Sequence, residues 1–201
     1  MEQYQTRYTH GMNIEKKFSD YISSGTLWRG LRYGQDNCPL ETRKSLRTIQ
    51  IPIDSEYAKQ KINRLPANWQ KTYVENIGNY FPSLARWDAD MLCEYNGKAC
   101  FFAELKSTNV KYSTTCIEIS SYLAALTNER LGAPLYFIFN LPDKVIKWSY
   151  LSLDELPRCV VGICDGKSAA GSKTPFVKID KRYLSRPIEH LLAQYQDDWL
   201  L

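Results

Sequence analysis

Four charged side chains between residues 88 and 106 have the types and spacing of a catalytic site. Asp88 and Asp90 precede the apolar run Met-Leu-Cys, and Glu104 and Lys106 follow the apolar run Phe-Phe-Ala. Carboxylate and backbone oxygens, here with the carbonyl of Leu105, are ligands that Mg²⁺ or Mn²⁺ prefers. Such an ion polarises a phosphoryl oxygen and activates a bound water, while a nearby lysine orients that water or neutralises charge on the phosphate. The alternative is an ordinary hairpin that ends in a salt bridge.

The turn between the two runs decides whether the carboxylates meet. Asn96-Gly97 is a strong signal for a β-hairpin, and strand side chains alternate between the two faces of a sheet. A two-residue turn pairs Asp90 with Ala103 and points both aspartates away from Glu104. A three-residue loop instead brings Asp88 or Asp90 opposite Glu104, depending on where the loop begins. The site therefore requires an odd loop or one β-bulge.

The segment around this hairpin predicts alternating strands and helices. Residues 82–141 have the pattern of strand, turn, strand, helix and strand, with the helix at about 114–131. The last strand, at 134–141, is apolar throughout and is therefore expected in the centre of a sheet. A strand at 174–180 and a helix after Pro187 follow. This alternation predicts an α/β fold with a mixed sheet.

The first third of the chain predicts three helices. Residues 13–24 have helical spacing of apolar side chains, with Asn13 as a cap and Gly25 as a stop. Residues 54–65 and 68–79 are two short amphipathic helices. The stretch between these helices and the first one is rich in Arg and broken by Gly and Pro.

Composition limits the class of protein. The chain has 201 residues, 44% of them hydrophobic and 24% charged, which suits one globular domain. Its formal net charge of +4 permits an anionic partner without requiring one. The sequence has no apolar run of membrane-spanning length and no signal-peptide core near residue 1. We expect an intracellular, cytoplasmic protein with no membrane partner.

Taken in order, these elements resemble the PD-(D/E)xK nuclease superfamily, and within it the Holliday-junction-resolvase and restriction-endonuclease type. Ala89-Asp90 leads directly into the apolar strand, the hairpin follows, and Glu104-Leu105-Lys106 is the ExK element. Glu15 lies on the early helix, as the family's early helical glutamate does. The chain departs from the pattern in having alanine rather than proline before Asp90, and in the roughly 75 residues that separate Glu15 from Asp90.

The resemblance implies a restriction-endonuclease-like αβββαβ core, with a mixed central sheet flanked by helices and a helical insertion. It covers about residues 10–30 and 82–141. The expected organisation is a single nuclease-like domain over 1–201, with the core at about 10–30 and 82–190 and the insertion at about 36–80.

The resemblance also implies roles for individual residues. Asp90 and Glu104, with the carbonyl of Leu105, would bind Mg²⁺ or Mn²⁺, and Lys106 would be the catalytic lysine. Asp88 is the alternative to Asp90, which we prefer because the apolar strand follows it directly. Glu15 would bind metal through water or hold a second ion. Polar residues on the helix after ExK often point into such sites, and the candidates are Ser113, Thr115 and Glu118.

Basic residues near the start of the chain would contact nucleic acid. Lysine and arginine bind phosphates without reading sequence, and aromatic side chains can stack on unpaired bases. Two aromatics, Trp28 and Tyr33, lie among the densest basic set, which comprises Lys16, Lys17, Arg29, Arg32, Arg43, Lys44 and Arg47.

The function expected from these observations is a metal-dependent endonuclease that hydrolyses DNA phosphodiester bonds. We expect it to act as a homodimer, since cutting two strands takes two sites. One alternative is a non-catalytic nucleic-acid-binding or protein-interaction module on a nuclease-like fold. A second is a structure-specific RNA endonuclease with the same chemistry.

Overall fold

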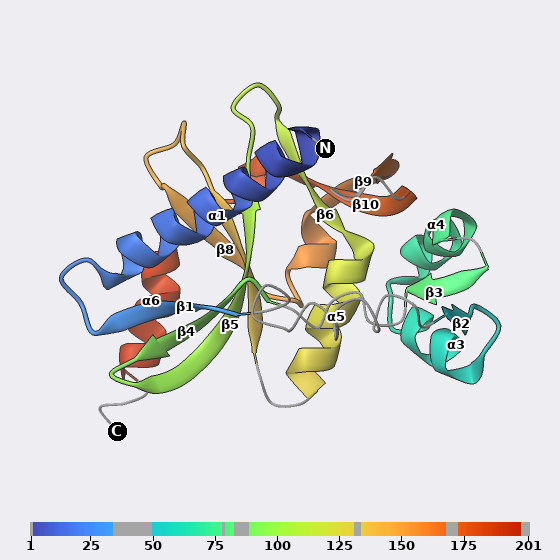
Figure 1. The fold of residues 1–201 in the computed structure, drawn as a ribbon, viewed down its shortest axis with the longest axis horizontal. Helices are drawn as coiled ribbons and strands as arrows, with labels where there is room; N and C mark the ends of the chain where they lie inside the picture. Colours follow the sequence, from blue (N-terminus) through green and yellow to red (C-terminus); the bar gives the residue numbers. More distant parts are fainter. Residues whose placement is uncertain are drawn as a thin grey trace.

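A mixed five-stranded sheet forms the centre of the molecule. The computed structural model describes residues 2–33, 50–77, 79–82, 89–130, 134–167 and 173–197. The strand order is β1-β4-β5-β7-β8, and only the β5–β7 pair is parallel. The strands are β1 Trp28–Arg32, β4 Met91–Tyr95, β5 Lys98–Ser107, β7 Leu135–Asn140 and β8 Trp148–Leu151 (Figure 1). The apolar strand β7 lies in the interior of the sheet, between β5 and β8, as predicted.

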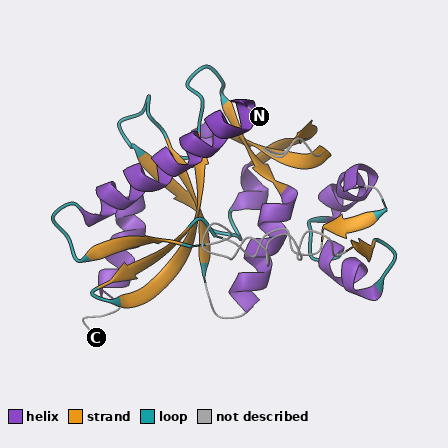
Figure 2. Ribbon diagram, viewed as in Figure 1, coloured by secondary structure: helices purple, strands orange, loops and turns teal. Residues whose placement is uncertain are grey.

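Helices cover both faces of this sheet (Figure 2). On one face, α1 (Glu2–Ser23) and α6 (Ile188–Asp197) share a buried cluster with β4 and β5. On the other face, α5 (Ile119–Arg130) packs against β7 through a second cluster. The predicted fold class, α/β with a mixed central sheet flanked by helices, is confirmed. No helix within the described ranges is long and apolar enough to cross a membrane.

A second, antiparallel sheet has the order β6-β10-β9. Its strands are β6 Thr114–Glu118, β9 Val160–Lys167 and β10 Lys173–Asp180, and short 3₁₀ turns occupy Leu156–Cys159 (η2) and Lys181–Tyr183 (η3). The predicted helix at 114–131 is wrong in its first turn and a half, because residues 114–118 pair with β10. Ile117 lies in the core, and the β-branched side chains of this stretch favour a strand.

The helical insertion contains the two short helices that the sequence predicts. They are α3 (Glu56–Ile62) and α4 (Ala67–Ile77), and they lie beside a small antiparallel pair, β2 (Gln50–Pro52) and β3 (Tyr80–Pro82). Ser55 caps α3 by accepting the N–H of Ala58. The buried Trp69 ring of α4 lies 5.0 Å from that of Tyr122 on α5, so these helices extend the core. The domain boundaries themselves stay a prediction.

The N-terminal region differs from expectation in two ways. Helix α1 begins at Glu2, so Asn13 is inside the helix rather than its cap; Gly25, with φ +69°, follows the end of the helix as predicted. Strand β1 was missed because Gly30 and two arginines interrupt its pattern. Here α1 approaches the sheet closely: Ser19 Oγ donates to the Gly30 carbonyl at 3.0 Å, and a Cβ at Gly30 would lie 2.7 Å from Cε of Met91.

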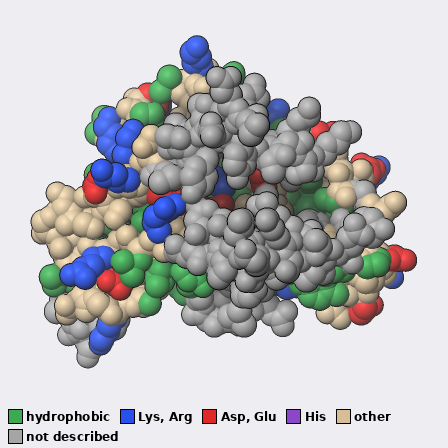
Figure 3. Space-filling view, viewed as in Figure 1, with side chains coloured by type: hydrophobic (Ala, Val, Ile, Leu, Met, Phe, Trp, Pro, Cys, Tyr) green, Lys and Arg blue, Asp and Glu red, His purple; other side chains and the backbone are tan. Residues whose placement is uncertain are grey.

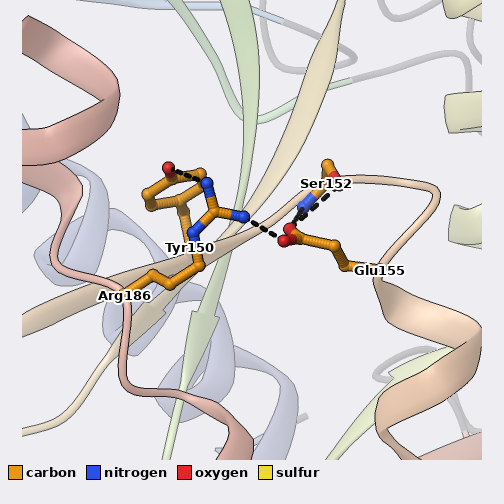
Figure 4. A network of polar contacts seen from close by, with 4 residues as sticks. All are labelled: Tyr150, Ser152, Glu155 and Arg186. Atoms are coloured by element: carbon orange, nitrogen blue, oxygen red, sulfur yellow. Dashed lines mark hydrogen bonds and ion pairs between the residues drawn. The ribbon is translucent and has the colours of Figure 1, made fainter. Parts of the chain in front are cut away.

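A polar network fastens β8 to the segment that leads into α6 (Figure 4). The Arg186 guanidinium donates to Glu155 and, at 2.5 Å, to the Tyr150 hydroxyl, and it lies 4.5 Å from the centroid of the Tyr150 ring. Glu155 also accepts the backbone N–H and the hydroxyl of Ser152. Burial raises the pKa of Glu155, but the Ser152 hydrogen bonds and the Arg186 charge outweigh it and leave this pKa below its ordinary value.

Candidate active site

Glu104 and Lys106 share one face of β5. Along this strand Phe101, Ala103 and Leu105 are buried against α1 and α6, so the alternate residues point to the opposite face. The Glu104 side chain is 12% exposed and that of Lys106 is 21% exposed. Lys106 Nζ lies 2.6 Å from Oε1 of Glu104. The two charges therefore form a partly buried pair within the strand.

A β-bulge in the hairpin brings Asp90 to the same place. Asn96 and Gly97 have φ values of +49° and +77° and form a two-residue turn that pairs Tyr95 with Lys98. The register then shifts after Glu94, and Met91 pairs with Ala103. Continuing this register by one residue places Asp90 opposite Glu104. The sequence required an odd loop or one bulge; the chain has an even turn and a bulge.

Backbone contacts on both sides hold Asp90. Its Oδ2 accepts the N–H of Leu105 at 2.6 Å, and its carbonyl accepts the N–H of Tyr33 at 2.9 Å. The β4–β5 ladder ends at Met91, so Leu105 lies beyond the paired part of β4. Since the N–H and C=O of one strand residue point the same way, the Leu105 carbonyl lies on the side of β5 that faces Asp90.

The charges at this point are not balanced. Burial and the negative charge of Glu104 raise the pKa of Asp90 well above its ordinary value, and Glu15 raises it further. Lys106 and the hydrogen bond from Leu105 act in the opposite direction without cancelling this effect. The ionised form of Asp90 is therefore disfavoured at this point, and a nearby cation would stabilise it.

Glu15 on α1 acts on the site through its charge, which raises the pKa of Asp90. Ile14, Phe18 and Ile22 bury the inner face of this helix, and Glu15 lies at its edge with a side chain that is 14% exposed. Its Oε2 accepts Nε of Arg32 at 2.5 Å. Arg32, predicted to contact nucleic acid, therefore also neutralises the charge of Glu15.

The donors present suit a hard divalent cation. Asp90 and Glu104 offer carboxylate oxygens and Leu105 offers a carbonyl, the ligand types of Mg²⁺ and Mn²⁺. Within the described ranges, no three His, Cys, Asp or Glu side chains gather as a group that could hold an ion. Among the described residues, Asp90, Glu104 and the Leu105 carbonyl are the ligands available to an ion here, and water would complete its shell. Asp88, the alternative ligand, lies outside the described residues.

The polar candidates after the ExK element are not on a helix. Ser113 is in the loop before β6, and Thr115 and Glu118 belong to β6 itself. Thr115 is buried, and Glu118 accepts a hydrogen bond from Ser120 at 3.3 Å. The expected placement of these candidates on a helix is therefore wrong, because the helix begins only at Ile119.

The predicted nucleic-acid contacts are placed in part. Lys16, Lys17, Arg29 and Arg32 are exposed, whereas Arg43, Lys44 and Arg47 fall outside the described residues. Trp28 is 1% exposed and its ring lies 5.3 Å from that of Tyr95, so it is a core side chain and not a stacking platform for bases. Tyr33 is 45% exposed.

Comparisons with known proteins give a loose structural similarity and no match in sequence. No protein-family model matches the chain, and no curated protein matches it. Among solved structures, the chain is similar to Hjc, a Holliday junction resolvase from Archaeoglobus fulgidus. The TM-score is 0.33 and the identity 14%, over 51% of this chain and 72% of that one. A similarity at this level establishes no shared activity.

Proposed function

We propose that the chain is a metal-dependent nuclease that hydrolyses DNA phosphodiester bonds. The observation that supports this most is the convergence of Asp90, Glu104 and Lys106 at the end of one bulged hairpin. A second support is the order of the elements in the central sheet and on its faces. With the insertion between β1 and β4 and the strand β6 set aside, it is a helix, three antiparallel strands, a helix and a parallel strand. This is the αβββαβ order that the resemblance to PD-(D/E)xK nucleases implied.

In this proposal Asp90 and Glu104, with the Leu105 carbonyl, hold Mg²⁺ or Mn²⁺. When bound, the ion would polarise the phosphoryl oxygen and lower the pKa of a water molecule. Glu15 would act through a water or a second ion. The raised pKa of Asp90 is relieved when a positive charge lies between the carboxylates, so this part of the protein would become more stable on binding the ion.

Lys106 would position the reactants. Its Nζ donates to Oε1 of Glu104 in the structure. With substrate bound, it would donate a hydrogen bond to the attacking water or to a non-bridging phosphate oxygen. Hydrolysis then forms a bond between the water oxygen and phosphorus. It breaks the bond to the bridging oxygen, which leaves with its electron pair and receives a proton. Exposed basic residues on α1 and β1 would contact the flanking phosphates.

The test is a cleavage assay on plasmid and branched DNA with Mg²⁺ or Mn²⁺, alongside RNA of matched shape. We expect cleavage that EDTA abolishes, and a loss of roughly a hundredfold or more in Glu104→Gln and in Lys106→Ala. Glu94→Gln is the matched control, because Glu94 lies on the same hairpin near its turn. A cooperative unfolding transition in every variant should show that each one remains folded.

Three results would change the proposal. Full activity in Glu104→Gln or Lys106→Ala would remove these residues from the mechanism. Metal-independent DNA binding without cleavage would favour a non-catalytic module. Cleavage of RNA alone would favour the RNA endonuclease. Light scattering of the active species would show whether it is a homodimer.

A further inference from the structure

A cationic groove opens beyond the end of β5, the strand that carries Glu104 and Lys106. Its volume is about 500 Å³. It is formed by three segments that are far apart in the sequence: the loop between β5 and β6, the loop between β7 and β8, and η3. Figure 1 shows both loops at the upper edge of the molecule. Lys106 and Lys111 are five residues apart on β5 and the loop that continues it.

The groove carries more positive than negative charge. Four cations line it against two carboxylates, Asp143 and Asp180. Asp180 is occupied by Arg182, whose Nη2 lies 2.8 Å from Oδ2. Lys111 and Lys144 are exposed, and within the described part of the chain their ammonium groups have no hydrogen-bond or ion-pair partner. Figure 3 shows Lys and Arg side chains at this upper edge.

An aromatic platform stands at the same place. Tyr112 is 64% exposed and the neighbouring Val110 is 56% exposed. Both lie on a short loop that its own hydrogen bonds fix: Asn109 accepts the N–H of Lys111 through its side chain at 2.9 Å and that of Tyr112 through its carbonyl at 3.2 Å. An exposed tyrosine on a fixed loop provides a stacking surface at little entropic cost.

The groove wall is built before any ligand arrives. Lys181 is 9% exposed, and its Nζ donates to the Asn109 carbonyl at 2.6 Å while its N–H donates to the Ser113 carbonyl at 2.9 Å. Thr108 Oγ1 donates to the Asn140 carbonyl at 2.7 Å. One lysine therefore joins η3 to both ends of the tyrosine loop, and a threonine fastens the loop to β7.

We propose that this groove binds an unpaired stretch of the nucleic acid strand that continues from the Glu104–Lys106 site, with Tyr112 stacking on a base and Lys111 and Lys144 contacting phosphates. This inference rests on the proposed function for its substrate class. A cleft of this volume accepts ligand-sized groups, which matches the size of one or two unpaired nucleotides. Stacking with nearby cations is how proteins bind single strands without reading sequence. The substrate would therefore carry a single-stranded segment next to the cleaved bond, as in a flap, fork or branch.

The test measures binding in EDTA, so that it does not depend on cleavage. The probe is fluorescently labelled oligothymidine, followed by anisotropy with the full chain over a range of salt. We expect Tyr112→Ala to weaken binding by about five-fold to a hundredfold, and Tyr112→Phe, which keeps the ring, to leave it unchanged. The double variant of Lys111→Ala with Lys144→Ala should weaken binding and reduce the slope of log K against log salt by about 1.4.

Matched controls lie on the insertion. Tyr57, 46% exposed on α3, and Lys59 and Lys71 on α3 and α4 provide an exposed ring and exposed ammonium groups away from the groove. Their alanine variants should bind oligothymidine as the wild type does, and the circular dichroism of every variant should match the wild type.

The outcomes separate this inference from the proposed function. Unchanged affinity in folded Tyr112→Ala, or equal loss in the Tyr57→Ala control, overturns the groove. So does competition by an acidic peptide at the concentration at which oligothymidine itself competes, which would assign the groove to a protein. A wild type that binds oligothymidine through Tyr112 but cleaves no nucleic acid would refute the proposed nuclease activity and support the proposed groove. Cleavage without groove-dependent binding does the reverse.

Discussion

Substitution of Asp90 separates stability from activity. The buried charge of its carboxylate destabilises the fold, whereas the hydrogen bond that the carboxylate accepts from Leu105 stabilises the hairpin. Asp90→Asn keeps an oxygen that can accept the Leu105 N–H and removes a charge that burial and Glu104 disfavour. Asp90→Ala removes the acceptor as well. Leu105 is only 6% exposed, so its N–H would lose a partner where water cannot easily replace it.

The magnitudes follow from these contacts. A buried N–H without an acceptor costs about 1–3 kcal/mol, whereas relief of a disfavoured charge at a functional site yields gains of the order of 1 kcal/mol. We therefore expect Asp90→Asn to be more stable than the wild type and Asp90→Ala less stable. The two variants should differ by roughly 2–4 kcal/mol, or about 1–2 M in the urea midpoint. Neither variant should cleave DNA.

The assay is urea unfolding in EDTA near neutral pH, followed by tryptophan fluorescence, with Glu94→Gln as the control on the same hairpin. Equal midpoints for the Asn and Ala variants would show that the Leu105 hydrogen bond contributes nothing. A wild type more stable than Asp90→Asn would show that the charge is not disfavoured there, and the reasoning for a cation at this point would fail.

Two further predictions concern the scaffold. The pKa of Glu155 in the folded protein is below its ordinary value. The interactions of this carboxylate therefore stabilise the fold at any pH above the ordinary pKa, and the stabilisation is lost as the pH falls through the lowered pKa. Because the Glu155 and Arg186 side chains are 33% and 45% exposed, Glu155→Gln should lower the stability of the fold by at most about 1 kcal/mol at neutral pH and not at all in acid. Thermal unfolding measured over a range of pH checks this. A stability difference between variant and wild type that is the same at every pH would contradict it. Gly30→Val should destabilise by about 1–3 kcal/mol, because its Cβ would lie 2.7 Å from Met91 and 3.3 Å from Ile22, whereas Gly162→Ala, with nothing within 4 Å, is the control. Urea midpoints that do not distinguish these two glycine variants would refute close packing of Met91 and Ile22 around Gly30.

The local part of the fold could be predicted from sequence. Asn96-Gly97 fixes a two-residue turn because both positions need positive φ, and the apolar run of β7 indicates a central strand. Whether Asp90 lies opposite Glu104 depended on one extra residue in the hairpin. The sequence allowed this residue to lie in a three-residue loop or in a β-bulge. Nothing in the residues Lys98 to Cys100 shows that the extra residue is absorbed after the turn and not within it.

The parts that could not be predicted depend on partners distant in sequence. Strand β1 exists because Gly30 accepts α1 on one face and β4 on its edge. Strand β6 exists because β10, about sixty residues later, pairs with it. Trp28 has the type of a base-stacking residue, but the rings of Tyr95 and Phe101 enclose it. The cationic groove combines two loops and η3, and no single one of these segments forms a motif.

The hairpin bulge also affects how relatives of this chain should be recognised. The extra residue lies between the turn and Phe101, on the far side of the paired positions that hold Asp90 and Glu104. A homologue that lacks one residue between Lys98 and Cys100 would form a regular ladder with every pair from Cys93–Phe101 to Met91–Ala103 intact. Two lengths of hairpin therefore present the same carboxylates. A search that fixes the spacing between the aspartate and the ExK element would discard true members of the lineage, whereas one that allows a single-residue gap after the turn would retain them.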